Sequence, residues 1–287
     1  MHTVFSYNKD NLSLMPKRTD ESNKGTYGRL LCVCGSVGMC GAAYLAAKAA
    51  YRTGAGLVEI LTVKENLIPL QGSLPEAIIS VYDGNDPDLD AVLTSVERAD
   101  AIVIGCGLGR SAGARKILGA ILRSTEKQCV VDADALNIIS ANPALKKHLR
   151  DKIITPHPME FSRLTGISTD EILKNTERLA YGFARENGAV CLIKRHETII
   201  SDGSERVYVN KSGNSGMATA GSGDVLAGII GGILAQNKNS DLSLFEAACL
   251  GTYIHGLCGD IAAEALGEYS LMASDIIDSL RKVLKSI

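Results

Sequence analysis

The order of apolar and polar positions along the chain predicts alternating strands and helices. Short apolar runs bounded by Gly, Pro or Asp are typical of buried strands, and longer stretches of helix-forming residues with apolar positions three or four apart are typical of helices. Strands are expected at residues 29–34, 57–62, 101–104, 128–131, 152–155 and 190–194, and helices at 42–52, 112–123, around 136–138, and at 171–187, 243–266 and 274–284.

The pattern changes after the last of these strands. Residues 198–201 and 206–209 flank Asp202-Gly203-Ser204-Glu205, which predicts a β-hairpin. Residues 1–24 are polar and are expected as an arm with one helix and a loop. No repeat or linker interrupts the chain, so we expect one domain over residues 1–287. Its fold class is α/β: a three-layer α/β/α sandwich with a mostly parallel central sheet and a β-hairpin.

The stretch 213–236, GNSGMATAGSGDVLAGIIGGILAQ, is the most informative. Its second half is apolar with helical spacing, so a helix is expected to begin near Gly223-Asp224. The start of a helix leaves backbone N–H groups unpaired and attracts anions. Gly221 and Gly223 lack Cβ atoms, so a phosphate group can approach that backbone closely.

Asp224 is therefore expected beside a bound anion, where its carboxylate can take a proton from a substrate hydroxyl during phosphoryl transfer. The alternative is that residues 221–223 form only a turn and that Asp224 is an ordinary helix cap. Short glycine motifs recur by chance, so this motif alone leaves both interpretations open.

Composition and charge narrow the class of protein. The 287 residues are 46% hydrophobic and 22% charged, and 30 basic residues nearly balance 32 acidic ones. A net charge of −2 gives no reason to expect nucleic acid as a partner. The apolar stretches are too short for a membrane span, and the polar start has no signal-peptide pattern. We expect no membrane partner and a cytoplasmic location.

The eight cysteines do not suggest a metal site. None of them forms a C-x-x-C pair, and several lie in apolar runs such as LLCVCG and AVCLIK. Buried free thiols that pack as small apolar groups are the expected state, with neither zinc site nor disulfide framework.

With these segments in order, nearly the whole chain resembles the ADP/ATP-dependent NAD(P)H-hydrate dehydratase family, which has a ribokinase-like fold. The resemblance is carried by several motifs in order and spacing. They are KGTYGRLLCVCGSVGMCGAAYLAAKAAYRTGAGLVEI from residue 24, IGCGLG at 104–109, VVDADALN at 130–137, ITPHPMEFSRLTG at 154–166, IKRHET at 193–198, and the stretch 213–236.

The resemblance implies repair of a damaged nicotinamide cofactor. Hydrated NADH or NADPH (the S epimer) would be converted back to NADH or NADPH with ADP or ATP as phosphoryl donor and Mg²⁺ present. Phosphorylation of the ring hydroxyl and elimination of phosphate would amount to a net dehydration. Asp224 would be the base, and the backbone of Gly221 and Gly223 would stabilise the charge of the phosphoryl group. The family also implies a homotetramer.

The family's adenine-nucleotide loop, usually Lys-Gly-x-x-Thr, matches residues 194–198. The resemblance thus implies nucleotide binding by Lys194, Arg195, His196, Glu197, Thr198 and Gly223. The chain departs from the family pattern at four positions. Arg195 replaces a Gly, Cys106 a Pro and Met159 a Gly, and Ser222 replaces the commoner Thr but keeps the hydroxyl. Arg195 adds bulk and charge at the nucleotide loop, and ADP against ATP stays open.

Other residues are carried over as substrate or metal contacts. The resemblance implies substrate binding by Ala42, Gly107, Asn137, His157, Asn214 and Asp224, and places Glu160 near Mg²⁺ and phosphate. Each has a structural alternative: helix packing, a strand-to-helix turn, a hydrogen bond that caps a helix or turn, or for Glu160 a charge at a helix start.

Three alternative functions stay open from the residues. A sugar or hydroxyethylthiazole kinase of the same fold would share the GSGD chemistry. A dinucleotide-dependent oxidoreductase is suggested by Gly35-x-x-Gly38-x-x-Gly41 after a strand, with Glu59 on the next strand, although the spacing is not G-x-G-x-x-G. A non-catalytic nucleotide-binding module is the third, and an intact Asp224 argues against it.

Overall fold

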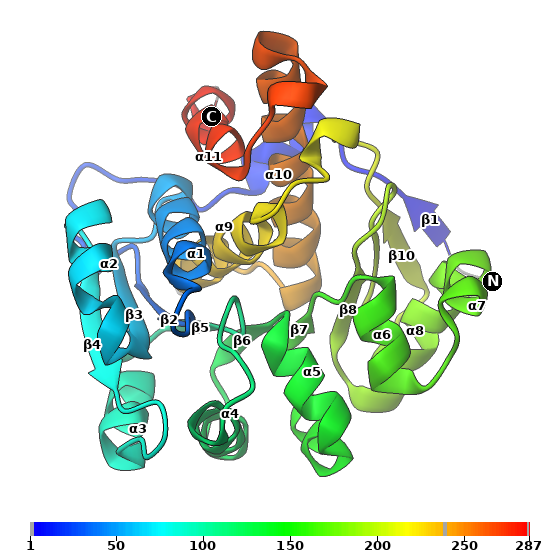
Figure 1. The fold of residues 1–287 in the computed structure, drawn as a ribbon. Helices are drawn as coiled ribbons and strands as arrows, with labels where there is room; N and C mark the ends of the chain where they lie inside the picture. The colour runs from blue at the N-terminus through cyan, green and yellow to red at the C-terminus, as the bar shows by residue number, and fades with distance from the viewer. Residues whose placement is uncertain (1–2, 238–239, 286) are drawn as a thin grey trace.

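A single ten-stranded sheet forms the centre of the molecule (Figure 1). The computed structural model describes residues 3–237, 240–285 and 287. The strand order is β1-β10-β9-β8-β7-β6-β5-β2-β3-β4, and all pairs are parallel except β8–β9 and β9–β10. The strands are β1 Thr3–Phe5, β2 Arg29–Val33, β3 Leu57–Val63, β4 Ile78–Tyr82, β5 Ala101–Ile104, β6 Gln128–Val131, β7 Ile153–Ile154, β8 Val190–Ile193, β9 Ile199–Ser201 and β10 Arg206–Val209.

Helices cover both faces of this sheet (Figure 1), and the sheet divides the hydrophobic core into two halves. One half lies under α1, α9, α10 and α11, and the other under α3, α4, α5, α6 and α8. The helices are α1 Cys40–Thr53, α2 Leu67–Ser73, α3 Leu89–Arg98, α4 Ala112–Ser124, α5 Asp134–Ala141, α6 Pro158–Thr165, α7 Thr169–Lys174, α8 Thr176–Asn187, α9 Ser222–Gln236, α10 Leu244–Leu266 and α11 Ala273–Leu284. The three-layer α/β/α fold expected from the sequence is confirmed.

Several local predictions need correction. The helix expected at 171–187 is two helices, α7 and α8, separated at Asn175. The arm begins with strand β1, which pairs with β10, because the chain start extends the hairpin side of the sheet. The elements β4, α2, α3 and α6 were not predicted, since their apolar positions are few or broken by polar residues.

The order of the strands reverses its direction next to β2. The chain runs from β2 outward to β3 and β4, and then returns to place β5 on the other side of β2. At the carboxyl ends of β2 and β5, the loops that follow the two strands therefore leave the sheet in opposite directions. Parallel α/β sheets bind ligands at such a switch point. The glycine loops at 35–41 and 105–109 lie there.

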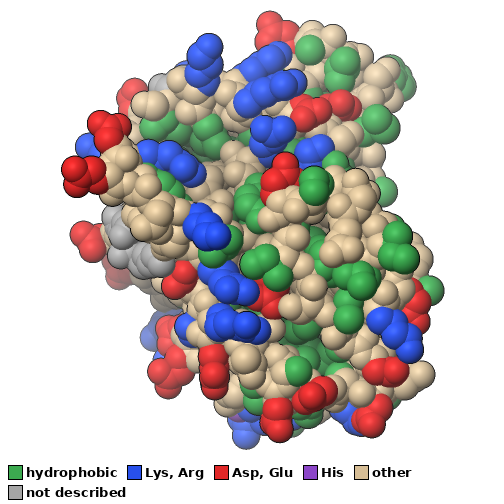
Figure 2. Space-filling view, turned by 90° about the vertical axis from the view of Figure 1, so that its left-hand side faces the viewer, with side chains coloured by type: hydrophobic (Ala, Val, Ile, Leu, Met, Phe, Trp, Pro, Cys, Tyr) green, Lys and Arg blue, Asp and Glu red, His purple; other side chains and the backbone are tan. Residues whose placement is uncertain are grey.

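The side of the molecule at α2 and β4 is shown in Figure 2. Basic and acidic side chains are interspersed on this face, with apolar side chains between them. Ile68 of α2 and Ile78 and Val81 of β4 are exposed to 81%, 40% and 44%. In the described part of the chain, no helix combines the length and the hydropathy needed to cross a bilayer.

Candidate active site

The N-terminus of α9 has the backbone geometry expected for an anion site. Gly221 precedes the helix in the left-handed region, with φ of 89°, and a Cβ at this position would lie 2.4 Å from Leu45 Cδ1. Only glycine fits there without strain. A Cβ on Gly223 would lie 3.4 Å from Lys194 Nζ, so a cation stands beside the unpaired N–H groups of the helix. Both features favour a phosphate group at this position.

Lys194 is surrounded by carboxylates. Its Nζ lies 2.6 Å from Asp132 Oδ1 and 4.0 Å from Glu160 Oε2. Burial alone would lower the Lys194 pKa, but the charges of Asp132 and Glu160 outweigh burial and raise it. The lysine is therefore a cation at neutral pH, held next to the start of α9.

Asp224 lies in the first turn of α9, next to this cluster. Its pKa is raised to about 6, first by burial and then by the negative charge of Asp132, while the Lys194 charge acts in the opposite direction. A carboxylate with a pKa near 6 is ionised at neutral pH and is a stronger base than an ordinary aspartate. The geometry thus fits the predicted role of Asp224 in accepting a proton.

A cavity of about 580 Å³ opens in front of α9. Seven of the predicted site residues line it together. They are His157, Lys194, Arg195, His196, Thr198, Asn214 and Gly223. Its other walls come from residues 210–222 and from α10. A cavity of this volume is suited to a ligand of nucleotide size.

His157 lines this cavity and also caps α6. Its Nδ1 accepts hydrogen bonds from the backbone N–H groups of Met159 and Glu160, at 3.2 and 3.3 Å. Burial and then the Lys194 charge lower its pKa, so the imidazole is neutral at neutral pH. With Nδ1 acting as acceptor, Nε2 carries the proton, and it lies 3.4 Å from Glu160 Oε1.

Asn214 reaches the same cavity, but the loop around it uses its amide. Asn214 Oδ1 accepts from Gly216 N at 3.1 Å, and Nδ2 donates to Asp260 Oδ1 at 3.0 Å. Asp260 Oδ2 also accepts from Gly213 N at 3.0 Å. The structure therefore favours a supporting role for Asn214, and direct contact with substrate stays a prediction.

Ala42 and Gly107 meet at the switch point, away from the nucleotide-sized cavity. Gly107 has φ of 59°, and a Cβ there would lie 2.8 Å from Ala42 Cβ. Cys106, beside Gly107, has its Sγ 4.0 Å from Asp132 Oδ2. One ligand atom each of Cys106, Asp132 and Asp224 lies within 4.8 Å of the others. Asp132 connects this side of Asp224 with the Lys194 side, since its Oδ1 lies 2.6 Å from Lys194 Nζ.

The remaining predicted residues lie outside the cavity. Asn137 Oδ1 accepts from Arg163 Nη1 at 2.9 Å, which turns the amide toward α6. Glu197 lines a neighbouring cavity instead. Glu160 is buried, and its Oε2 accepts from His157 N at 2.9 Å. Its other oxygen, Oε1, lies 3.4 Å from His157 Nε2, and the role of Glu160 as a metal ligand stays a prediction.

Sequence reasoning missed Asp132 and His255. Asp132 is 1% exposed and directly follows β6, and a carboxylate at the carboxyl end of a parallel strand was the available signal. His255 lies within α10, and its Nε2 is 3.3 Å from Ser222 Oγ. Burial lowers its pKa to about 4. No local pattern distinguishes His255 from a packed residue of an apolar helix.

The structure contradicts the dinucleotide fingerprint suggested by the glycines at 35, 38 and 41. Glu59, which would bind a ribose in that interpretation, is 1% exposed within β3. Its carboxylate accepts hydrogen bonds from Arg29, Ser80 and Ser95. It is enclosed by these partners and cannot reach a ligand at the loop.

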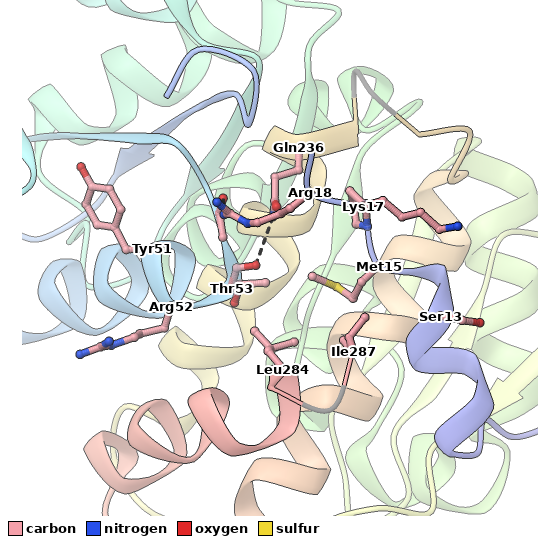
Figure 3. Close-up of a pocket in the computed structure, with 12 residues that line it drawn as sticks. Ser13, Met15, Lys17, Arg18, Tyr51, Arg52, Thr53, Gln236, Leu284 and Ile287 are labelled. Atoms are coloured by element: carbon pink, nitrogen blue, oxygen red, sulfur yellow. Dashed lines mark hydrogen bonds between the residues drawn. The ribbon is translucent and has the colours of Figure 1, made fainter. Parts of the chain in front are cut away.

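A second cavity, of about 650 Å³, lies at the opposite ends of α1 and α9 (Figure 3). Gln236 Nε2 donates to Thr53 O there, and Arg18 Nη2 donates to Gly54 O. Arg52 points away from the cavity in Figure 3. These groups satisfy carbonyls at the C-terminus of α1. Despite its larger volume, this cavity lacks the carboxylates and the helix N-terminus of the site at Asp224.

Comparison with known proteins identifies a sequence family. The family described as NAD(P)H-hydrate dehydratase matches residues 30–282. An ADP-dependent (S)-NAD(P)H-hydrate dehydratase of Neisseria meningitidis is 39% identical over 269 residues, which are 92% of this chain and 87% of that protein. The chain also matches longer curated relatives, named bifunctional NAD(P)H-hydrate repair enzymes, at 37–41% identity, and it spans about half of their length.

Solved structures agree with the sequence matches. A ribokinase-like superfamily protein from Enterococcus faecalis superposes with a TM-score of 0.85 at 31% identity, covering 99% of this chain and 96% of that one. An ADP/ATP-dependent NAD(P)H-hydrate dehydratase from Bacillus subtilis, co-crystallised with ATP and Mg²⁺, gives a TM-score of 0.82 at 28% identity and covers 98% of both chains.

Proposed function

Because the chain belongs to the NAD(P)H-hydrate dehydratase family, as its motifs indicated, we propose that it dehydrates the S epimer of hydrated NADH or NADPH at the expense of ADP or ATP. The observation that carries this proposal is the arrangement around α9. An aspartate with a raised pKa and a lysine flank a helix N-terminus that faces a nucleotide-sized cavity.

The two sides of Asp224 give the two reactants separate places. The donor occupies the cavity lined by Lys194, Arg195 and Thr198, with its terminal phosphate at the N-terminus of α9. The nicotinamide ring enters from the switch point, past Ala42 and Gly107. Asp224 lies between them, which places a base next to both the ring hydroxyl and the phosphoryl group.

The reaction then takes two steps. Asp224 takes the proton of the ring hydroxyl as the hydroxyl oxygen attacks the terminal phosphorus, and the bond from phosphorus to the bridging oxygen breaks, leaving AMP from ADP or ADP from ATP. In the second step the carbon–oxygen bond to the new phosphate breaks and the adjacent ring carbon loses a proton. This restores the ring double bond and releases phosphate.

Lys194 and the helix N-terminus stabilise the charge of the transferring phosphoryl group. Both are in place before the ligand arrives, so no reorganisation accompanies the transfer. Closure of the site around the phosphate would strengthen these interactions, because water is excluded.

Mg²⁺ is the cation proposed to accompany the nucleotide. The buried carboxylates of Asp132 and Glu160, both within 4.0 Å of Lys194 Nζ, provide the oxygen ligands that Mg²⁺ prefers, whereas the Cys106 thiol does not. These two carboxylates would hold the ion together with the phosphates of the donor. When bound, it neutralises phosphate charge.

The direct test supplies the protein with hydrated NADH or NADPH, ADP or ATP, and Mg²⁺. We expect the absorbance of the reduced nicotinamide ring to return, with one phosphate released per ring repaired and with the S epimer alone consumed. A comparison of ADP with ATP, and of hydrated NADH with hydrated NADPH, shows which donor and which substrate the protein prefers. Accumulation of a stable phosphate ester of a sugar or thiazole alcohol instead would identify a small-molecule kinase of this fold.

We also propose a cytoplasmic homotetramer. The eight cysteines are free thiols, which a reducing compartment maintains. The apolar side chains exposed at α2 and the edge strand β4 provide a surface for self-association (Figure 2). Sedimentation equilibrium should give the mass of four chains, and a monomer across the concentration range would exclude this assembly.

A further inference from the structure

Arg195 occupies an unusual place between two cavities. It lines the nucleotide-sized cavity in front of α9 and also a cavity of about 510 Å³ at the junction of α7 and α8. Of the residues that line these two cavities, Arg195 is the one that they share. Arg195 therefore lies between them.

The guanidinium group reaches away from the nucleotide loop. Arg195 Nη1 donates to Thr176 Oγ1 at 2.8 Å and to Leu173 O at 3.3 Å. Leu173 O is one of the last carbonyls of α7, where a cation is favoured by the helix dipole. Thr176 Oγ1 is buried and donates its own proton to Ile172 O at 2.7 Å, so a lone pair is left for the arginine.

The loop that carries Arg195 has few other attachments. Residues 195–197 form no regular structure and are exposed. The backbone is tied at either end, by Lys194 N to Pro156 O and by Asn210 N to Thr198 O. Between these points, the hydrogen bonds of the Arg195 side chain fix the loop to the α7–α8 junction. The break at Asn175 provides the acceptors, because it exposes the end of α7.

We propose that Arg195 is a positioning residue that sets nucleotide affinity by fixing the loop 194–198 to Thr176 and Leu173. This inference rests on the proposed function, since it concerns the nucleotide site of that same function. The side chain acts through the loop and not on the phosphoryl group. Removing it frees the loop, so that binding must order the loop again.

The test uses two variants that break the same contact from opposite ends. Thr176→Val should raise the Kd and KM for ADP or ATP about fivefold, the effect of one lost hydrogen bond, Arg195→Ala should raise them at least as much, and both should leave kcat unchanged. The double variant should be no worse than Arg195→Ala, because that variant already removes the bond to Thr176 together with the bond to Leu173. Arg195→Lys should recover part of the affinity.

A matched control separates the contact from general loss of charge. Arg178 also lines the α7–α8 cavity but pairs with Glu171 at 3.1 Å, away from the loop. Arg178→Ala should leave nucleotide affinity as it is. Hydrogen exchange at the backbone of residues 194–198, without nucleotide, should speed up in Arg195→Ala and Thr176→Val and not in Arg178→Ala.

Different outcomes overturn different statements. Additive losses in the double variant, or unchanged exchange in Arg195→Ala, overturn the positioning role. A fall in kcat with unchanged KM in Arg195→Ala also overturns it, since Arg195 would then contact the phosphoryl group. Failure of the unsubstituted protein to bind either nucleotide overturns the proposed function itself, whereas normal binding with an unchanged Kd in Arg195→Ala overturns only this inference.

Discussion

The Lys194 ammonium group lies 2.6 Å from Asp132 Oδ1 and joins the nucleotide loop to the end of strand β6. The two residues also act on Asp224 with opposite sign. Burial has the largest effect and raises the Asp224 pKa, the charge of Asp132 raises it further, and the charge of Lys194 lowers it. The pair therefore adjusts the pH at which the proposed base becomes ionised.

This opposition predicts two shifts of the pH profile in opposite directions. A base works in its ionised form, so the rate falls as pH falls through its pKa, here about 6. Asp132→Asn should lower the Asp224 pKa and move the acid limb of kcat to lower pH. Lys194→Met should move the limb to higher pH. Steady-state rates from pH 5 to 8 measure both, and limbs that coincide with the unsubstituted enzyme would exclude Asp224 as the titrating base.

Asp224→Asn tests the base itself. The amide keeps the shape of the side chain but cannot accept the proton, so turnover should fall by about 10²–10⁴-fold. Nucleotide affinity should persist, because the cavity walls and the start of α9 are unaltered. Titration calorimetry with ADP checks binding in parallel with the rate assay. A variant that turns over at the original rate would remove Asp224 from the mechanism.

Gly221→Ala tests the backbone at the start of α9. The new Cβ would need a left-handed φ and would meet Leu45 Cδ1 at 2.4 Å. We expect a loss of about 1–3 kcal/mol in the free energy of unfolding, from backbone strain and overpacking. Chemical denaturation measures the loss, and a second change, Leu45→Ala, should relieve the overpacking but not the strain.

Gly182→Ala is the matched control for this prediction. Gly182 lies within α8, and a Cβ there meets no atom within 4 Å. Alanine is the better helix former, so this variant should gain about 0.5–1 kcal/mol. Equal losses at positions 182 and 221 would show that the close packing at Leu45 has no special effect.

His255 predicts a pH dependence of stability. Its pKa falls from the ordinary 6.5 to about 4 in the folded protein, because it is buried. Between these values the unfolded chain binds the proton and the folded chain does not, so unfolding becomes easier as pH falls from 6.5 toward 4. The full effect is about 3 kcal/mol.

His255→Gln should remove this contribution. Asp224 and Glu160, whose pKa values are raised, act in the opposite direction, so the difference between the two proteins is the quantity to measure. Urea unfolding at pH 7 and pH 5 provides it. The unsubstituted protein should lose more stability between these pH values than the variant does, and parallel losses would contradict the neutral buried state of His255.

The sequence by itself determined the fold class and the place of the central helix. Apolar runs of strand length alternate with helical periods, and this local pattern is sufficient for the α/β layers. Gly221, Gly223 and Asp224 were identified from adjacent positions, because a helix start is a local feature. The break of the helix at Asn175 was not visible, since both halves continue one apolar period.

Only the tertiary structure brought Lys194, Asp132 and Asp224 together. They lie on three segments far apart in the chain, and their contact depends on the strand order that places the ends of β6 and β8 near α9. It likewise revealed His255 against Ser222 and Arg195 against Thr176. Spacing along a sequence cannot encode such distances, because they arise when separate apolar faces pack on one sheet.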